Sequence, residues 1–212
     1  MLYLLAIIAL AALLAPWLTQ RLPQRAGWVL MLAPLATFAW LASQIPLVAG
    51  GEVLQQTLDW VPALGIQLSL RLDGLSLLFT LLISGIGALI VLYAGAYLAD
   101  HHQLGRFHAY LLLFMLAMLG LVLADDFIAL FMFWELTSIT SFLLISFNHK
   151  KGESRRAALQ ALLITGGGGL ALLAGLILLG SVSETWQFSQ LDASQVEEHA
   201  LLPAIMLLVL LG

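Results

Sequence analysis

One acidic residue, Glu135, lies in the middle of an otherwise uncharged apolar segment. The segment reads FIALFMFWELTSITSFLLISF from Phe127 to Phe147, with eight residues before the glutamate and twelve after it. An α-helix rises about 1.5 Å per residue, so this carboxyl would lie near the middle of a hydrocarbon layer about 30 Å thick. A charged group at that depth costs about 2.5–3.5 kcal/mol on insertion scales. Glu135 is therefore predicted to be a proton or ion site facing the interior of a helix bundle.

The predicted neighbours of Glu135 on its side of the helix are mostly apolar. At 100° per residue, Phe131, Ser138 and Phe142 share that side. Removal from water disfavours an ionised carboxylate, so an acid in this setting is suited to taking up and releasing a proton. The alternative interpretation of Glu135 is a structural ion pair or hydrogen bond that locks two helices together.

The composition is that of an integral membrane protein. Hydrophobic residues make up 62% of the chain and charged residues 9%, and the mean hydropathy is +1.03; soluble domains carry about 25% charged residues. Cysteine is absent, which excludes disulfides and thiolate-bound metals or clusters within these residues. The histidines His101, His102 and His108 show no metal-site pattern and are interpreted as loop residues. We expect no cofactor, no bound metal and no nucleic-acid partner.

Six apolar segments are long enough to cross a membrane, since a helical crossing takes about 20 residues. They are Met1–Thr19, Trp28–Val48, Leu72–Leu98, Phe107–Leu123, Phe127–Phe147 and Ala157–Leu179. A seventh begins at Leu201 and reaches Gly212 after only twelve residues. We therefore expect an all-α, multi-spanning helix bundle that is cut within its seventh span, as in the first part of a longer protein.

Basic residues are distributed unevenly among the connections between these spans. Seven of the eight fall in residues 20–27, 99–106 and 148–156, and the other is Arg71. The positive-inside rule predicts that these three connections are cytoplasmic and that the N-terminus is outside. In the external loop, residues 49–71, the weak alternation in GIQLSLRLDG predicts a short hairpin or an interfacial segment.

Glu135 needs a partner, and none of the complete spans contains Lys or Arg. We expect a cation that lies beyond Gly212, with water, a hydroxyl or a histidine of this chain as the alternatives. Four consecutive glycines, Gly166–Gly169, lie within the sixth span. Each weakens a helix by about 1 kcal/mol relative to alanine, and each also lets another group approach the backbone closely. Close helix packing is one explanation for them, and a kink or water-accessible break beside Glu135 is the other.

Five polar residues at the ends of the spans are weaker site candidates. Asp73 precedes the third span, and Asp125 and Asp126 precede the fifth, all at positions where aspartate serves as a helix N-cap. The aspartate pair could also form an outer vestibule for cations. His149 and Lys150 follow the fifth span, where they fit a basic cluster at the cytoplasmic surface. His149 could alternatively relay protons to the cytoplasm.

Three blocks of sequence together resemble the antiporter-like membrane subunits. This family joins the multi-subunit Mrp-type Na⁺/H⁺ antiporters with the large proton-pumping subunits of respiratory complex I. RLDGLSLLF and LIVLYAGAYL resemble its third span, ADDFIALFMFWELTSITSFLLISF its fifth, and SRRAALQALLITGGGGLALLAGLILL its sixth. WELTSITSFLLI and TGGGGLALLAG are most similar to the A subunit of the Mrp type.

The resemblance implies an all-helical membrane core with two inverted helix repeats, each with a broken helix that carries charged residues. It implies that Glu135 translocates protons and pairs with a lysine of the seventh span, which residues 1–212 do not contain. The chain would comprise a three-span region, 1–98, with the external loop 49–71, followed by the start of the first repeat at 107–212.

The resemblance also implies a function. The chain would belong to one component of a Na⁺/H⁺ antiporter in a bacterial inner membrane, a secondary transporter rather than an enzyme. Transport would be driven by the proton gradient, with other antiporter subunits, the lipid bilayer, Na⁺ and H⁺ as partners. One alternative is a proton-pumping subunit of a complex I type NADH:quinone oxidoreductase. Another is a helical scaffold without transport, in which Glu135 has no role in activity.

Overall fold

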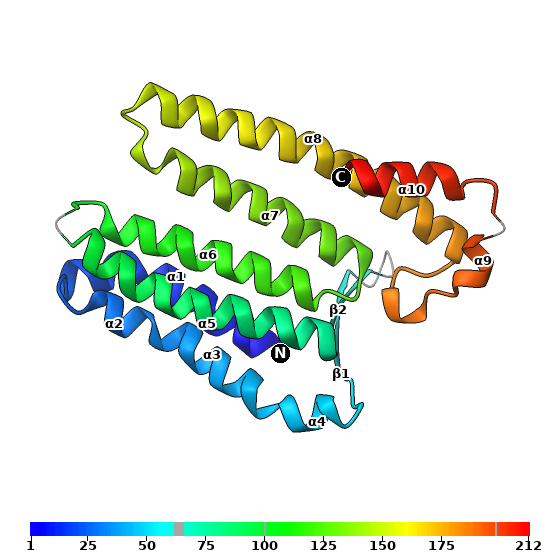
Figure 1. Ribbon diagram of the computed structural model, residues 1–212, viewed down its shortest axis with the longest axis horizontal. Helices are drawn as coiled ribbons and strands as arrows, with labels where there is room; N and C mark the ends of the chain where they lie inside the picture. The colour runs from blue at the N-terminus through cyan, green and yellow to red at the C-terminus, as the bar shows by residue number, and fades with distance from the viewer. Residues whose placement is uncertain (62–65, 100, 198) are drawn as a thin grey trace. The chain divides into compact units, whose positions relative to one another are not determined.

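The computed structural model describes residues 1–61, 66–99, 101–197 and 199–212 (Figure 1). In this described part, six helices are long and apolar enough to cross a membrane, as the sequence predicted. They are Leu2–Arg21, Ala26–Ala49, Gly74–Tyr97, Leu104–Leu123, Phe127–Asn148 and Gly152–Ser183. A shorter apolar helix, α10 (Leu202–Leu211), covers the seventh apolar segment. The expectation of an all-α, multi-pass membrane protein is confirmed.

The chain forms two compact units. The first contains residues 1–55 and 71–123, and the second contains residues 56–70 and 124–212. The units therefore divide between the fourth and fifth spans. The sequence analysis divided the chain differently, into a three-span region, 1–98, and the start of an inverted repeat at 107–212. That division concerns the repeat and not the packing of helices, and it stays a prediction.

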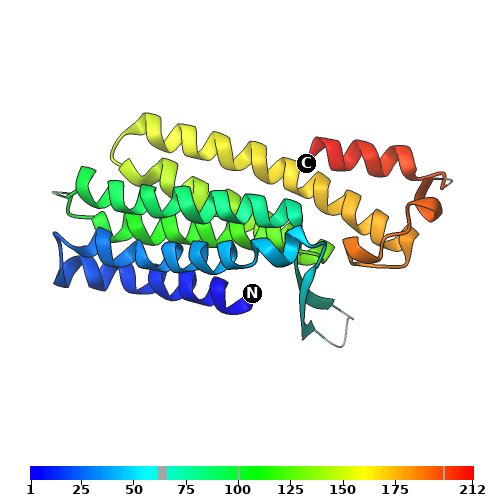
Figure 2. The same ribbon diagram turned by 60° about the horizontal axis from the view of Figure 1, so that its bottom comes forward.

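The first unit is a bundle of helices around α5 and α6. Its elements are α1 (Leu2–Arg21), α2 (Ala26–Leu30), α3 (Leu32–Ser43), α4 (Ile45–Ala49), α5 (Gly74–Tyr97) and α6 (Leu104–Leu123). The helices α2, α3 and α4 follow one another with single-residue interruptions and together make the second span. Helix α1 packs along α6, and α5 packs against α2, α3 and α6 (Figure 2).

Glycines allow two of these helix pairs to meet at the backbone. A side chain at Gly95 of α5 would place its Cβ 2.8 Å from the Cα of Gly27 in α2. A side chain at Gly105 of α6 would place its Cβ 2.7 Å from the Cα of Pro16 in α1. Small residues at helix crossings are the usual means of close packing in membranes, where the lipid supplies no hydrophobic driving force between helices.

The second unit contains two long antiparallel helices and most of a β-hairpin. Its elements are β1 (Leu54–Val61), β2 (Ile66–Leu72), α7 (Phe127–Ile145), η2 (Ser146–Asn148), α8 (Gly152–Ser183), η3 (Phe188–Gln190), α9 (Ala193–Glu197) and α10. The strands pair as a two-stranded sheet, as expected for a hairpin, which was one of the two predictions for this loop. Residues 54–55 of β1 and 71–72 of β2 belong to the first unit. Helix α7 packs on α8, and α8 packs on α10 (Figure 1).

Helix α8 begins earlier than the sequence analysis placed the sixth span. It starts at Gly152 rather than Ala157, so Glu153, Arg155 and Arg156 lie in its first turns and not in a loop. The prediction followed the apolar residues only, whereas glutamate and arginine are good helix formers. With 32 residues, the helix is about 48 Å long at 1.5 Å per residue. It therefore exceeds a hydrocarbon core of about 30 Å, which leaves room for its charged turns outside the apolar layer.

Candidate functional site

The start of α7 is fixed by a side-chain cap and an apolar contact. Asp126 is the N-cap, and its Oδ1 accepts hydrogen bonds from the backbone N–H groups of Ile128 and Ala129, both at 2.9 Å. The adjacent Phe127 is fully buried and packs with Leu172 and Leu176 of α8. These contacts determine which face of α7 meets α8, and hence where a residue two turns further along lies.

That residue is Glu135, whose carboxyl lies against the backbone of α8. The contact is at Gly169: a Cβ at that position would lie 3.2 Å from Cδ of Glu135 and would overlap its Oε1. It would also lie 3.6 Å from Cδ1 of Trp134. The glutamate therefore occupies space that only a glycine leaves free.

The Oε1 atom of Glu135 is buried, and it has no hydrogen-bond partner among the residues that the structure describes. An ionised oxygen in such a place is both desolvated and unpaired, which costs free energy until a donor or a cation approaches. Glu135 also lines an apolar groove of about 400 Å³ within the second unit. The groove is lined by Leu68, Ala129, Phe131, Met132, Phe133, Glu135, Leu136 and Ile139.

The hydroxyls near Glu135 are used within their own helix. Thr137 donates to the carbonyl oxygen of Trp134 at 2.7 Å, and Thr140 donates to that of Leu136 at 2.7 Å. Ser138, predicted to share the side of Glu135, is buried, and its hydroxyl lies 3.4 Å from the Trp134 oxygen. In the described part of the chain, no hydrogen bond from these hydroxyls reaches Oε1 of the glutamate.

The four-glycine segment makes close contacts at its second half. Helix α8 runs through Gly166–Gly169 without interruption, which supports close packing rather than a break. A Cβ at Gly168 would lie 3.3 Å from the carbonyl oxygen of Leu211 and 3.2 Å from that of Gly212, at the end of α10. At Gly166 and Gly167, a Cβ would meet no described atom within 4 Å.

The two aspartates before α7 have different contacts, although both were predicted as possible N-caps. Asp126 is the cap. Asp125 is buried, and its carboxylate accepts from the backbone N–H of Ser189 at 2.9 Å and from the hydroxyl of Ser189 at 2.6 Å. Its own N–H donates to the carbonyl oxygen of Ser69 in β2 at 2.9 Å. Burial raises the pKa of Asp126, opposed by the hydrogen bonds from Ala129 and Ile128.

Asp73 is the N-cap of α5, as predicted. Its Oδ1 accepts from the N–H of Ser76 at 3.0 Å, and its own N–H donates to the Ser76 hydroxyl at 2.7 Å, which completes a capping box. Arg71 Nε lies 3.4 Å from the Asp73 Oδ2. The hydrogen bond from the Ser76 N–H is the main cause of a lowered Asp73 pKa.

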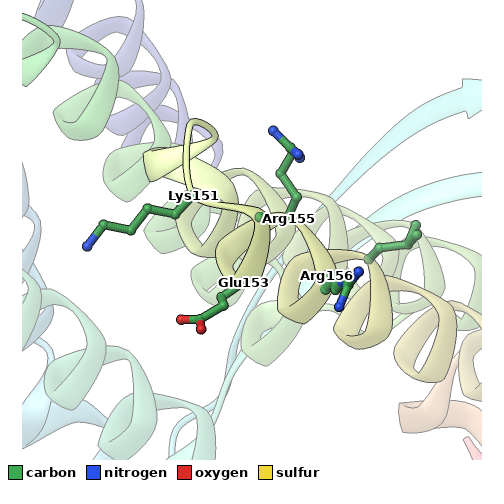
Figure 3. Close-up of a pocket in the computed structure, with 6 residues that line it drawn as sticks. Lys151, Glu153, Arg155 and Arg156 are labelled. Atoms are coloured by element: carbon green, nitrogen blue, oxygen red, sulfur yellow. The ribbon is translucent and has the colours of Figure 1, made fainter.

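The basic residues after α7 are exposed. His149 and Lys150 lie in the short connection to α8, where the His149 carbonyl oxygen accepts from Nη1 of Arg155 at 2.9 Å. At the start of α8, the side chains of Lys151, Glu153, Arg155 and Arg156 point in different directions around an open hollow of about 680 Å³ (Figure 3). The structure thus places His149 at the end of the helix that carries Glu135.

His108 was interpreted as a loop residue, and that interpretation is wrong. It lies in the second turn of α6 and is fully buried. Its Nδ1 lies 3.2 Å from the carbonyl oxygen of Leu104, and its Nε2 lies 3.1 Å from that of Val91 in α5. His108 already lay inside the predicted fourth span, Phe107–Leu123, and the helical spacing of Leu104, His108 and Leu112 was the signal that the loop interpretation missed. No group of three potential metal ligands occurs among the described residues.

Two family models match the chain. Residues 124–212 match "NADH:quinone oxidoreductase/Mrp antiporter, TM", and residues 60–108 match "NADH-Ubiquinone oxidoreductase (complex I), chain 5 N-terminus". The A1 subunit of the Na⁺/H⁺ antiporter of Staphylococcus haemolyticus is 46% identical over 188 residues, which cover 88% of this chain and 23% of that protein. The chain spans about a quarter of the length of the curated relatives that it matches.

Solved structures share the fold. A chain of the Mrp complex from a Dietzia species superposes with a TM-score of 0.81 at 30% identity, over 99% of this chain and 23% of that one. A chain of the membrane-bound sulfane sulfur reductase, an archaeal respiratory membrane complex, superposes with a TM-score of 0.79 over 98% of this chain and 32% of that one. Its identity to this chain is 21%, so this second likeness concerns the fold alone.

Proposed function

We propose that this chain, whose residues 124–212 match the NADH:quinone oxidoreductase/Mrp antiporter model, is part of a monovalent cation/proton antiporter subunit in which Glu135 carries the proton. The transported cation is Na⁺ in this proposal, and the proton gradient drives its export. The protein works as a secondary transporter and not as a catalytic enzyme. The name of the Staphylococcus haemolyticus relative, which is that of a Na⁺/H⁺ antiporter component, supports this choice of ions.

The observation that carries the proposal is the setting of Glu135 within α7. Its Oε1 is buried and unpaired in the described residues, and the carboxyl borders an apolar groove. A neutral acid is tolerated there, and an ionised one needs a positive partner. Such a group can alternate between the two forms as a cation approaches and leaves, which couples proton release to cation movement.

The positive partner would come from outside residues 1–212, either from the rest of the full protein or from another subunit. The family resemblance implies a lysine of the seventh span for this role. Asp125, Asp126 and Asp73 have structural contacts that account for their presence, so any role of theirs in a cation vestibule stays a prediction. The relay role of His149 and Lys150 also stays a prediction, supported by their place at the end of α7.

The cellular setting of the protein follows from the same proposal. It would lie in a bacterial inner membrane within a complex of several antiporter subunits. The positive-inside rule places the connections that contain Arg21, Arg106 and Lys150 in the cytoplasm and the N-terminus outside. In the first unit, the connections after α1 and after α5 do lie at one end, where Thr19, Gln20, His101 and His102 line a common pocket.

A second function deserves a test because residues 60–108 match a complex I model. In that case the protein would pump protons with energy from a redox reaction and would not exchange Na⁺. Glu135 would carry protons in the same way, so the two functions differ in energy source and in neighbouring subunits. The experiment must therefore vary Na⁺ and the glutamate independently.

The test uses the full protein with its partner subunits in everted membrane vesicles that are energised with NADH. A pH-sensitive dye reports the proton gradient before and after NaCl is added. Wild type is compared with Glu135→Gln, which keeps the size of the side chain but cannot ionise. Glu52→Gln is the matched control, because Glu52 is exposed in the loop before β1.

Three outcomes are informative. If NaCl dissipates the gradient in wild type and in Glu52→Gln but not in Glu135→Gln, the antiport proposal stands. If NaCl has no effect in any of them and Glu135→Gln builds a smaller gradient from NADH, the redox-pump function replaces it. If Glu135→Gln behaves as wild type throughout, Glu135 is structural and the proposal is wrong.

A further inference from the structure

We infer that Gly169 is a positioning residue for the proton-carrying carboxyl of Glu135. The inference rests on the proposed role of Glu135 and goes beyond it, because it assigns to one glycine of α8 the placement of a side chain on α7. We use the term carboxyl slot for the space beside the Gly169 Cα that holds the Glu135 Oε1.

The geometry of the slot is specific to one atom pair. A Cβ at Gly169 would overlap Oε1 of Glu135 and lie 3.2 Å from its Cδ. The hydrogen that glycine carries in place of a side chain therefore points toward Oε1, an arrangement typical of weak Cα–H···O contacts between helices. Any larger residue at position 169 would displace the carboxyl from the slot.

The neighbouring glycines separate this role from ordinary helix packing. Gly168 faces the carbonyl oxygens at the end of α10, and Gly166 and Gly167 face open space in the described residues. All four glycines weaken the helix equally through backbone entropy. Only the contact at Gly169 involves the glutamate, so the same substitution along the segment distinguishes the two effects.

The slot has a consequence for the chemistry of Glu135. Oε1 is buried there without a donor among the described residues, so the slot itself offers this oxygen no hydrogen bond. Glu135 also lines the apolar groove on α7. Gly169 would thus let the glutamate lie against α8, and a side chain at position 169 would hold the carboxyl away from α8, toward the groove.

The experiment compares Gly169→Ala with Gly166→Ala and Gly167→Ala in the full complex in everted vesicles. Gly169→Ala is expected to lower Na⁺-dependent proton movement by up to about a hundredfold, the loss that a displacement of about 1 Å can cause. The two controls should transport as wild type. A second readout is the rate at which dicyclohexylcarbodiimide, an apolar reagent for protonated carboxyls, modifies Glu135, measured by mass spectrometry. That rate should rise several-fold in Gly169→Ala alone.

The two readouts separate this inference from the proposed function. If Glu135→Gln transports as wild type but Gly169→Ala still changes the labelling of Glu135, the proposed function fails and the positioning role stands. If Gly169→Ala loses transport with unchanged labelling, or if all three alanine variants lose transport equally, the glycine supports helix packing and the inference is overturned. Where Glu135→Gln abolishes transport, transport by Gly169→Ala equal to that of the controls also overturns it.

A double variant covers the case in which Gly169→Ala does not assemble. Aspartate is one methylene shorter than glutamate, so Glu135→Asp withdraws the carboxyl from the slot and removes the overlap with an alanine at position 169. The double variant Gly169→Ala with Glu135→Asp should then assemble as well as Glu135→Asp alone. If assembly is not restored, the overlap lies elsewhere and the inference is wrong.

Discussion

Adjacent aspartates at the start of α7 show how the same side chain can have different structural roles at neighbouring positions. The Asp126 carboxylate accepts hydrogen bonds from N–H groups in the first turn of its own helix. Asp125 binds Ser189, which is 64 residues away in the chain. A helix N-terminus attracts negative charge in both cases. Of the two roles predicted for the pair, the contacts support the N-cap role for Asp126. Asp125 instead connects the start of α7 to Ser189.

Asp125→Ala should loosen the segment around Ser189 without abolishing transport. The change removes the acceptor for two hydrogen bonds and leaves the Ser189 N–H unpaired, which costs about 1–3 kcal/mol. Hydrogen–deuterium exchange should therefore become faster at Phe188 and Ser189. Asp192→Ala is the control, because Asp192 is an aspartate whose hydrogen bonds are to the nearby Ser194. Loss of Na⁺-dependent transport with unchanged exchange would instead favour the cation vestibule.

Asp126→Asn should make the protein more stable at neutral pH. Burial raises the pKa of Asp126, so the folded state carries a desolvated charge at pH 7 that the unfolded state carries in water. The stability of the wild type should therefore fall as pH rises from the ordinary aspartate pKa of about 3.9 through the raised folded value. Asparagine keeps an oxygen acceptor for the Ile128 and Ala129 N–H groups.

Thermal unfolding of the purified protein between pH 4 and pH 7 measures this effect. The advantage of the asparagine variant should be greatest at pH 7 and should shrink as the pH is lowered, because wild-type Asp126 then becomes neutral as well. A variant that is less stable than wild type at pH 7 would mean that attraction of the charge to the helix N-terminus exceeds its desolvation cost.

At the scale of helices and strands, the sequence predicted those elements that depend on local hydropathy or on alternation of polar and apolar residues. The six spans, the hairpin in residues 49–71 and the cap at Asp73 follow from local patterns, and the structure contains them. Helix ends were less accurate, since α8 begins at Gly152 and α6 at Leu104, each ahead of the predicted start of its span. The contact between Glu135 and Gly169 could not be predicted, because it depends on the register between α7 and α8 and not on either sequence alone.

Gly95→Ala should destabilise the crossing of α2 and α5. The new methyl group would lie 2.8 Å from the Gly27 Cα, which is backbone and cannot turn away. Overpacking of this kind costs about 1–3 kcal/mol and should lower the unfolding temperature of the purified protein. Gly74→Ala is the control, because a Cβ there meets no described atom within 4 Å. Equal unfolding temperatures for the two variants would show that α2 and α5 can move apart to admit the methyl group without loss of stability.

At the scale of the whole molecule, the arrangement of charge predicts an orientation in the membrane. Seven of the eight basic residues lie within three connections or in the helix turns beside them, and these connections alternate with acidic ones along the chain. The positive-inside rule describes how the chain inserts into the membrane and not how stable the folded protein is. The packing within the compact units therefore does not test the predicted orientation. Glu52 and Lys150 are exposed residues on opposite sides in the predicted topology, and three spans separate them in the sequence.

Single cysteines at these two positions test the orientation, because residues 1–212 contain no cysteine of their own. In a cysteine-free version of the full protein, a membrane-impermeant maleimide should label Glu52→Cys in intact cells. It should label Lys150→Cys only after the membrane is opened. The reverse pattern would leave the span count intact and would show that the orientation is inverted. Labelling of both cysteines from the same side would contradict the three spans between them, because an odd number of crossings must separate the two faces.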